Sequence, residues 1–239
     1  MIKNIFSVAL TSLLLNGVYA QTDLKKVSSI LKNAKEGEVV LLDNFLDPNF
    51  KKIEYKQTIA PGPQFIISDD PEYIRLPEAI AMQEEVLPGA VRLYVYNVNG
   101  INEPQQMPRK INAVIKNLGK ENLHLRMLKY SSQKPSTNYF QIGKQGLADY
   151  FASEEKGNVR VVKPGEVIAI DEAFDKHIVK YDELVHGLYE FVVDQPAQIS
   201  VLQFAPEKTA VQAFSQIDTV IPFSHVNAGR GIFPVSNYK

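Results

Sequence analysis

The residues of this sequence best suited to metal chemistry lie between positions 171 and 186. His177 and His186 are nine positions apart, and Asp182 lies between them among further carboxylates. Imidazole and carboxylate together form a donor set that suits zinc and similar ions. The spacing therefore indicates a candidate metal site at His177, His186 and Asp182. The alternative is a solvated acidic loop in which His186 is a turn residue next to Gly187.

A second candidate site lies on one expected strand. Within 91–97, Arg92, Tyr94 and Tyr96 alternate with aliphatic residues, so they share one face of the strand. Tyrosine rings present apolar faces to sugars, and a cation beside them adds a second kind of contact. We therefore consider Arg92, Tyr94 and Tyr96 candidate ligand-binding residues. The alternative is that another element covers this face and that the tyrosines pack inside the fold.

Motifs for nucleophilic or metal-dependent catalysis are absent from the sequence. It contains no Gly-x-Ser-x-Gly, no His-Glu-x-x-His and no cysteine. Asp69, Asp70 and Glu72 resemble the paired carboxylates of a glycosidase, but Pro71 among them favours a turn. We assign no catalytic residue and expect no cofactor, so a binding role is favoured over an enzymatic one.

The apolar pattern predicts a mostly β fold. Short apolar or alternating segments are separated by turn residues such as Pro61-Gly62-Pro63 and Pro164-Gly165. Turns about every 8–12 residues favour a β-sandwich, either immunoglobulin-like or jelly-roll-like. The expected strands are 38–43, 52–56, 64–68, 79–86, 91–97, 110–116, 121–128, 137–143, 159–163, 166–170, 188–193 and 199–204.

Several turns predict which strands pair, and two segments predict helices. Asn117-Leu118-Gly119-Lys120 predicts a tight hairpin, because Asn and Gly tolerate the turn backbone. Pro164-Gly165 and Asp194-Gln195-Pro196 are expected to join two further strand pairs. A short amphipathic helix is expected at 22–36 and a helical insertion near 144–153.

The first twenty residues have the three parts of a secretory signal. Lys3 precedes an apolar run at 5–15, and Ala20 supplies the small residue at the cleavage position. The run is shorter than the roughly 18 residues that span a bilayer. We expect cleavage after Ala20 and an extracytoplasmic location in the periplasm, at the cell surface or in the medium. Without cysteine there is no disulfide and no lipoprotein anchor.

Charge and length limit the partners. We expect a signal peptide at 1–20, a helix with short strands at 21–88 that packs on the main domain, and a β-sandwich domain at 89–239. The formal net charge of −1 gives no field that would attract nucleic acid. After signal cleavage no segment is expected to span a membrane. The expected partner is a glycan or a protein at the cell surface, and the sequence predicts no oligomeric state.

Several short motifs resemble a family of uncharacterised, β-rich secreted proteins of Gram-positive and related bacteria. The resemblance covers roughly residues 68–238 and implies export and a β-sandwich, without an established activity. The motifs that carry it are Ser68-Asp69-Asp70-Pro71-Glu72-Tyr73, Arg92-Leu93-Tyr94-Val95-Tyr96-Asn97-Val98-Asn99, Pro135-Ser136-Thr137-Asn138-Tyr139, Gly143-Lys144 with Tyr150-Phe151-Ala152-Ser153, Gly187-Leu188-Tyr189-Glu190-Phe191 and Arg230-Gly231-Ile232-Phe233-Pro234.

Three functions are consistent with these observations. The first is a non-catalytic secreted or cell-envelope protein with a binding or structural role. The second is a secreted hydrolase that acts on polysaccharide or cell-wall material. The third is an assembly subunit that donates a strand at a sheet edge.

Overall fold

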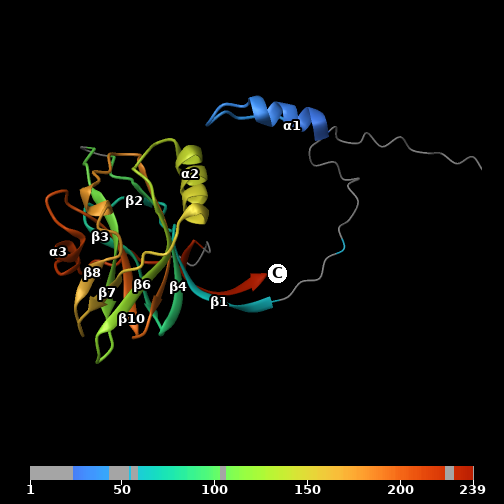
Figure 1. The fold of residues 1–239 in the computed structure, drawn as a ribbon. Coiled ribbons are helices and arrows are strands. Elements are labelled where there is room, and N and C mark those ends of the chain that lie inside the picture. The colour runs from blue at the N-terminus through green and yellow to red at the C-terminus, as the bar shows by residue number, and fades with distance from the viewer. Residues whose placement is uncertain (1–23, 43–53, 55–58, 103–105, 224–228, 239) are drawn as a thin grey trace, which may run out of the picture. The chain divides into compact units, whose positions relative to one another are not determined.

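The chain divides into two compact units, Met1–Tyr55 and Lys56–Lys239. The structure is a computed structural model that describes residues 24–42, 54, 59–102, 106–223 and 229–238 (Figure 1). In the first unit, α1 (Leu24–Asn33) confirms the expected amphipathic helix. No helix in the described ranges is long and apolar enough to cross a membrane.

Two expected strands near the start of the chain have different outcomes. The strand at 38–43 is wrong over 38–42, which contain no strand. These residues pair with no other described segment, and the side chains of Val39 and Leu41 are exposed, so nothing supplies the hydrogen bonds that a strand requires. The strand at 52–56 lies outside the described residues except for Glu54.

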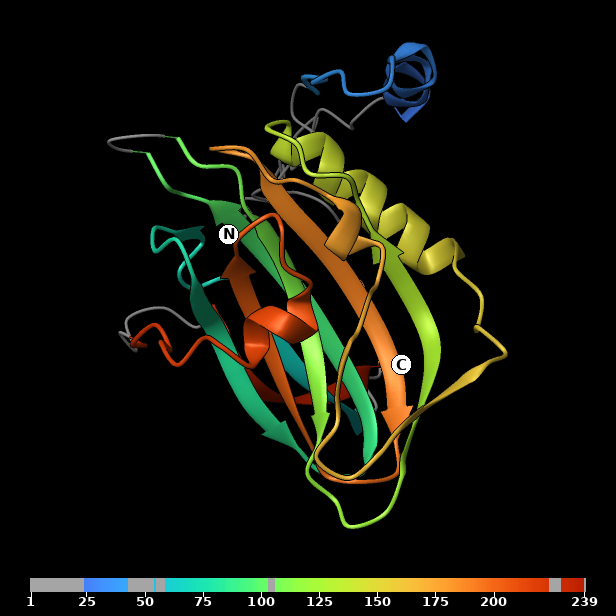
Figure 2. The same ribbon diagram turned by 90° about the vertical axis from the view of Figure 1, so that its left-hand side faces the viewer.

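The second unit confirms the mostly β fold as two sheets packed face to face (Figure 2). Its strands begin at Ile59, so segments upstream of residue 89, the expected start of the sandwich, are hydrogen-bonded parts of both sheets. The larger sheet has seven strands and the smaller has four. The larger sheet contains β1 (Ile59–Ser68), β2 (Tyr73–Ile74), β4 (Gly89–Asn99), β6 (Leu123–Ser132), β7 (Val159–Val162), β9 (Leu184–Val193) and β11 (Arg230–Tyr238). The smaller sheet contains β3 (Ala79–Val86), β5 (Lys110–Asn117), β8 (Val167–Ala169) and β10 (Ala197–Phe204).

The strand order is that of a jelly roll, which decides between the two sandwich types expected. The smaller sheet runs β3-β10-β5-β8, and the larger sheet contains β4-β9-β6-β7 in that order. From β3 to β10, every strand except β7 lies in the sheet opposite its predecessor, the arrangement of a double-sheet jelly roll. β1 pairs in parallel with β4, and β11 pairs with β1 in antiparallel orientation, which extends the larger sheet at one edge.

The hairpins expected from the turns are wrong in their pairing. The strands form, but β5 and β6, β7 and β8, and β9 and β10 each lie in opposite sheets. Asn117 shows the physical reason at the first crossing: its buried side chain donates to Glu121 O at 2.7 Å and Val162 O at 2.8 Å. Its Oδ1 accepts from Gly119 N at 2.8 Å. In a hairpin these backbone groups would bond to the neighbouring strand. Here the Asn117 side chain bonds to them instead, so the chain can cross from one sheet to the other.

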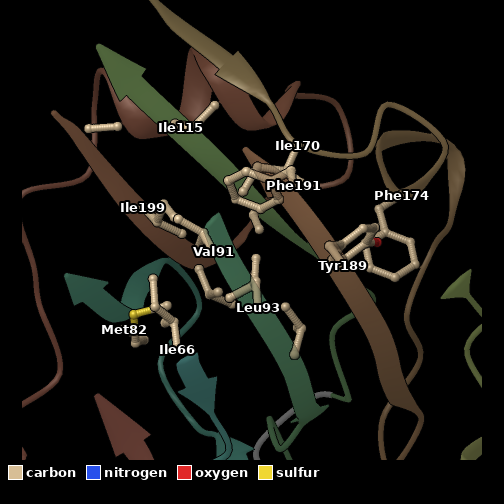
Figure 3. Packing of buried hydrophobic residues seen from close by; sticks show 14 of the residues in the cluster. Ile66, Met82, Val91, Leu93, Ile115, Ile170, Phe174, Tyr189, Phe191 and Ile199 are labelled. Carbon is tan, nitrogen blue, oxygen red and sulfur yellow. The ribbon is translucent and has the colours of Figure 1, made fainter. Parts of the chain in front are cut away.

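The alternation predicted for β4 is confirmed. Val91, Leu93 and Val95 are completely buried between the sheets, while Tyr94 and Tyr96 lie half-buried on the outer face. Val91 and Leu93 pack with residues of both sheets in the main core (Figure 3).

One expected strand is a helix instead. The strand at 137–143 is wrong, because α2 (Tyr139–Ala152) begins five residues before the expected insertion. Asn138 caps it: its Oδ1 accepts from Gln141 N at 3.1 Å, a cap that the aromatic residues next to it hide in the sequence. α2 packs on β6 and β9, and the shorter α3 (Ala210–Phe214) packs on β5, β8 and β10 (Figure 2).

The crossing at Asn117 gives a test of the fold. We expect Asn117→Ala to lower the free energy of unfolding by about 2–4 kcal/mol, because two carbonyls and one N–H lose buried partners. Urea denaturation measures the change, and Lys120→Ala, an exposed position in the same turn, is the matched control within about 0.5 kcal/mol of the parent. Equal stability of the two variants would contradict this role for Asn117.

Candidate ligand-binding site

The outer face of the larger sheet collects the side chains with candidate chemistry. On β4 and β9, Tyr96 lies opposite His186 and Arg92 lies opposite Glu190. On the other side of β4, the parallel strand β1 places Ile67 beside Tyr94. We define the aromatic face by its outward-pointing residues, Phe65, Ile67, Tyr94, Tyr96 and His186.

Three rings form the centre of the aromatic face. The Tyr94 and Tyr96 ring centroids are 5.9 Å apart with 29° between the planes. His186 stands edge-on to both, at 5.5 Å from Tyr94 and 6.2 Å from Tyr96. Such edge-to-face contacts contribute about 0.5–1.5 kcal/mol each. His186 is therefore the residue that fixes the two tyrosine rings relative to each other.

At Gly146, the backbone of α2 lies directly against the imidazole ring of His186. A Cβ at Gly146 would overlap Cε1 and Nδ1 of the imidazole, so a residue without a side chain is required there. His186 is 3% exposed, and its Nδ1 has no hydrogen-bond partner. Burial lowers the pKa of His186 to about 4, so the ring is neutral near pH 7. Gly143, on the same helix, has open space at the corresponding point.

A hydrogen-bonded ion pair anchors the C-terminal half of α2. Arg92 donates from Nε at 2.9 Å and from Nη2 at 2.7 Å to Glu190 Oε2, and the Tyr150 hydroxyl donates to the same oxygen at 2.7 Å. Burial opposes the charge of Glu190, but these bonds hold its pKa below the ordinary value. Burial and the bond to Glu190 raise the pKa of Tyr150 to about 12. Arg92 thus holds α2 in place through Glu190.

A second polar cluster anchors the start of α2. The hydroxyls of Tyr73 and Tyr139 are 3.0 Å apart, and they contact Asp182 Oδ1 at 2.8 Å and 3.1 Å. Tyr139 also donates to Asp182 O at 2.9 Å. Asp182 has a φ of 65°, in the left-handed region that few residues other than glycine adopt. Through Oδ1, the Asp182 carboxylate thus binds the hydroxyls of both tyrosines.

One flank of α2 faces the aromatic face. The other flank is tied toward β6, because Asp149 accepts from Gln133 at 2.8 Å and Ser153 Oγ accepts from Tyr130 N at 3.1 Å. Helical geometry places Leu147 and Phe151 on the opposite flank, the side of Tyr150 and β4. Both are exposed, Leu147 at 49% and Phe151 at 68%.

Carboxylates mark the end of β1 beside the tyrosines. Burial, reinforced by the charges of Glu72 and Asp70, raises the pKa of Asp69 to about 6. After burial, the charges of Asp69 and Glu72 are causes of the raised pKa values of both Tyr94 and Tyr96. The Asp69 side chain accepts no hydrogen bond from any described residue. A donor supplied by a ligand would find this carboxylate without competition.

The hydroxyls of Tyr94 and Tyr96 differ from those of their neighbours. The hydroxyl groups of Tyr73, Tyr139 and Tyr150 each donate a hydrogen bond to an oxygen of the protein. The hydroxyls of Tyr94 and Tyr96 have none within the described ranges, and neither belongs to the fully buried polar atoms that lack a partner. Two stacked rings thus present accessible, unused hydrogen-bonding groups.

The structure does not assemble the metal site proposed at His177, His186 and Asp182. His177 follows a short 3-10 helix and packs edge-on to Phe174, with ring centroids 6.4 Å apart. His186 lies under α2, and Asp182 binds the two tyrosines. No group of three or more side chains that could hold a metal ion occurs in the part of the chain that is described.

The sequence pattern put Tyr94 and Tyr96 on one face, which the structure confirms, but it missed the residues that position their rings. A glycine inside an amphipathic helix is a signal of close packing, and Gly146 carried that signal. Glu190 had no such signal, because its partners Arg92 and Tyr150 are far from it in sequence.

Searches with models of known protein families, among curated proteins and among solved structures find no match for this chain.

The two glycines of α2 give a matched test of how the helix is seated. We expect Gly146→Ala to lower the free energy of unfolding by about 1–3 kcal/mol, because the added methyl overlaps His186. Gly143→Ala should instead raise it by about 0.5–1 kcal/mol through helix propensity. Urea denaturation measures both, and changes of the same sign would refute the contact between α2 and His186.

The carboxyl of Asp69 gives a test by pH. Because the folded pKa of Asp69, about 6, lies above the ordinary value of 3.8, the native state binds more protons than the unfolded state between these values. Stability should therefore fall as pH rises from about 4 to about 6, by about 1–2 kcal/mol, because solvent screens part of the effect at this half-buried group. We expect Asp69→Asn to remove this part of the profile in denaturation series at fixed ionic strength. Parallel profiles for the parent and the variant would show that Asp69 is not desolvated.

Proposed function

We propose that this protein is an exported, non-catalytic binding module that holds a glycan against the aromatic face. The observation that carries the proposal is the pair of stacked tyrosines whose hydroxyls bond to no described residue, beside the Asp69 carboxylate, which bonds to none either. Side chains that only pack would be expected to satisfy such groups internally, as Tyr139 and Tyr150 do.

A sugar fits the chemistry of these groups. The C–H face of a pyranose packs on an aromatic ring, and its hydroxyls both donate and accept hydrogen bonds. Asp69 would accept from one hydroxyl, and the Tyr94 and Tyr96 hydroxyls would bond to others. The neutral His186 keeps a charge out of the centre of the site, so binding requires no counterion there.

The carboxylates also restrict the kind of glycan. Asp69, Asp70 and Glu72 act electrostatically at one end of the aromatic face. Like charges brought together at an interface are unfavourable, whereas a cationic or neutral group is accepted. The module is thus expected to bind neutral glycans or those with free amino groups, and to reject polyuronates and sulfated chains.

Calorimetry with the full chain against three classes of polysaccharide tests this function. We expect a neutral glycan or an amino glycan to bind and a polyuronate not to bind. Tyr94→Ala should weaken binding about 10-fold or more, since loss of a stacked ring costs about 1–3 kcal/mol by analogy with base stacking on aromatic side chains. Tyr94→Phe should weaken binding less, because it removes only the hydroxyl.

The control shortens an exposed side chain elsewhere on the larger sheet, outside the aromatic face. Val161 lies on β7 at the far edge of the sheet and is exposed, so Val161→Ala should bind as tightly as the parent. Binding that is unchanged in both Tyr94→Ala and Tyr96→Ala would overturn the assignment of the aromatic face.

A hydrolase is the second candidate, and one observation favours it. A carboxyl whose pKa is raised to about 6 next to a second carboxylate, Glu72, is the kind of pair that serves as general acid and partner in glycoside hydrolysis. Release of reducing ends from the polysaccharides that bind would distinguish the two functions. If the parent releases sugar and Asp69→Asn binds without releasing it, the protein is an enzyme.

Export is part of the proposal and rests on the sequence of residues 1–20, which lie outside the described residues. The basic start, apolar run and small residue at position 20 support cleavage and release from the cytoplasm. A glycan ligand of the cell surface or the surroundings is consistent with that location.

A further inference from the structure

We propose that Arg109 is the centre of a second site, independent of the aromatic face, which binds a small oxyanion that carries a proton, such as hydrogen phosphate or bicarbonate. Arg109 directly precedes β5 and pairs with Val179 by two backbone hydrogen bonds. It is 7% exposed, and the buried Nε has no partner among the described residues. Within the same residues, its side chain bonds only from Nη2 to Met107 Sδ at 3.1 Å, and a thioether is a weak acceptor.

The guanidinium also lacks an ion pair. None of the salt bridges within 4.0 Å in the described part of the chain includes Arg109. A buried charge without a counterion costs several kcal/mol, and proteins normally pair it. An anion taken from solution would supply the missing counterion.

The acidic group on which Arg109 acts electrostatically, Glu78, is already bonded to other donors. Glu78 accepts from Lys208 Nζ at 2.9 Å and 3.1 Å and from Ala205 N at 3.2 Å. The charge of Arg109 reaches Glu78 only as a weaker cause of its lowered pKa. Lys208 therefore already neutralises Glu78, and no described carboxylate accepts a hydrogen bond from Arg109.

An unused acceptor on the neighbouring strand indicates that the anion carries a proton. Gln203 is completely buried, and its Oε1 has no partner in the part of the chain that the structure describes. Its amide orientation is fixed, because Nε2 donates to Ile74 O and Leu76 O. Gln203 lies opposite Ile111, two residues from Arg109, and such diagonal neighbours share a face at about 7–8 Å. An oxyanion with one hydroxyl would accept from Arg109 and donate to Gln203.

Thermal unfolding of the full chain tests the site. At constant ionic strength and pH 7, chloride is replaced stepwise by phosphate. We expect Tm to rise by about 5–10 °C at a hundredfold excess of phosphate over its Kd, because an anion that binds only the native state stabilises it. Arg109→Met should abolish the rise and, in chloride, should not lower Tm, since an apolar side chain removes the uncompensated charge.

Arg126→Met is the matched control, because Arg126 is half exposed and pairs with Glu155 at 3.2 Å on the other sheet. It should keep the full phosphate response. A crystal soaked in arsenate, which like phosphate keeps a proton near pH 7, provides a second measurement that does not depend on a variant, with an anomalous peak expected at the Arg109 guanidinium. No rise in the parent, equal rises in the parent and Arg109→Met, or density for water alone at Arg109 would overturn the proposal.

Discussion

The contact between Gly146 and the imidazole of His186 sets the position of α2, and the aromatic face depends on that position. Because glycine has no side chain, the helix backbone lies against the ring at Gly146. α2 is then close enough to the sheet for Tyr150 to bond to Glu190 and for Tyr139 to bond to Asp182. The same imidazole stands against Tyr94 and Tyr96. One buried, neutral ring therefore seats the helix on one side and orients the tyrosines on the other.

The local features of the fold could be read from the sequence, whereas the pairing of its strands could not. Period-two alternation put Val91, Leu93 and Val95 on one face of the strand and Tyr94 on the other, because side-chain direction in a strand is a local property. The turn after Asn117 marked a bend correctly but did not indicate the sheet to which the next strand belongs. That choice depends on the bond from Asn117 to Val162, a residue 45 positions away.

The candidate site divides in the same way. Spacing alone put Tyr94 and Tyr96 on one face, but the roles of Arg92, His186 and Asp182 depend on partners distant in the chain. Arg92 was expected to bind a ligand and is held by Glu190, 98 positions away. Asp182 was expected to bind a metal, but its carboxylate accepts from Tyr73, 109 positions away. Residue type predicted which groups these side chains could bind, and only the tertiary contacts show that they bind other residues of the protein.

The most direct test of the account is an NMR titration that observes the tyrosine rings. With ring-labelled tyrosine, a neutral oligosaccharide is added to the full chain, and the signals of Tyr94 and Tyr96 are assigned from their Phe variants. The account predicts saturable shifts for these two rings, while the ring of Tyr150 stays nearly unchanged because its hydroxyl remains bound to Glu190. Saturable binding that shifts other rings and leaves Tyr94 and Tyr96 unmoved would contradict it.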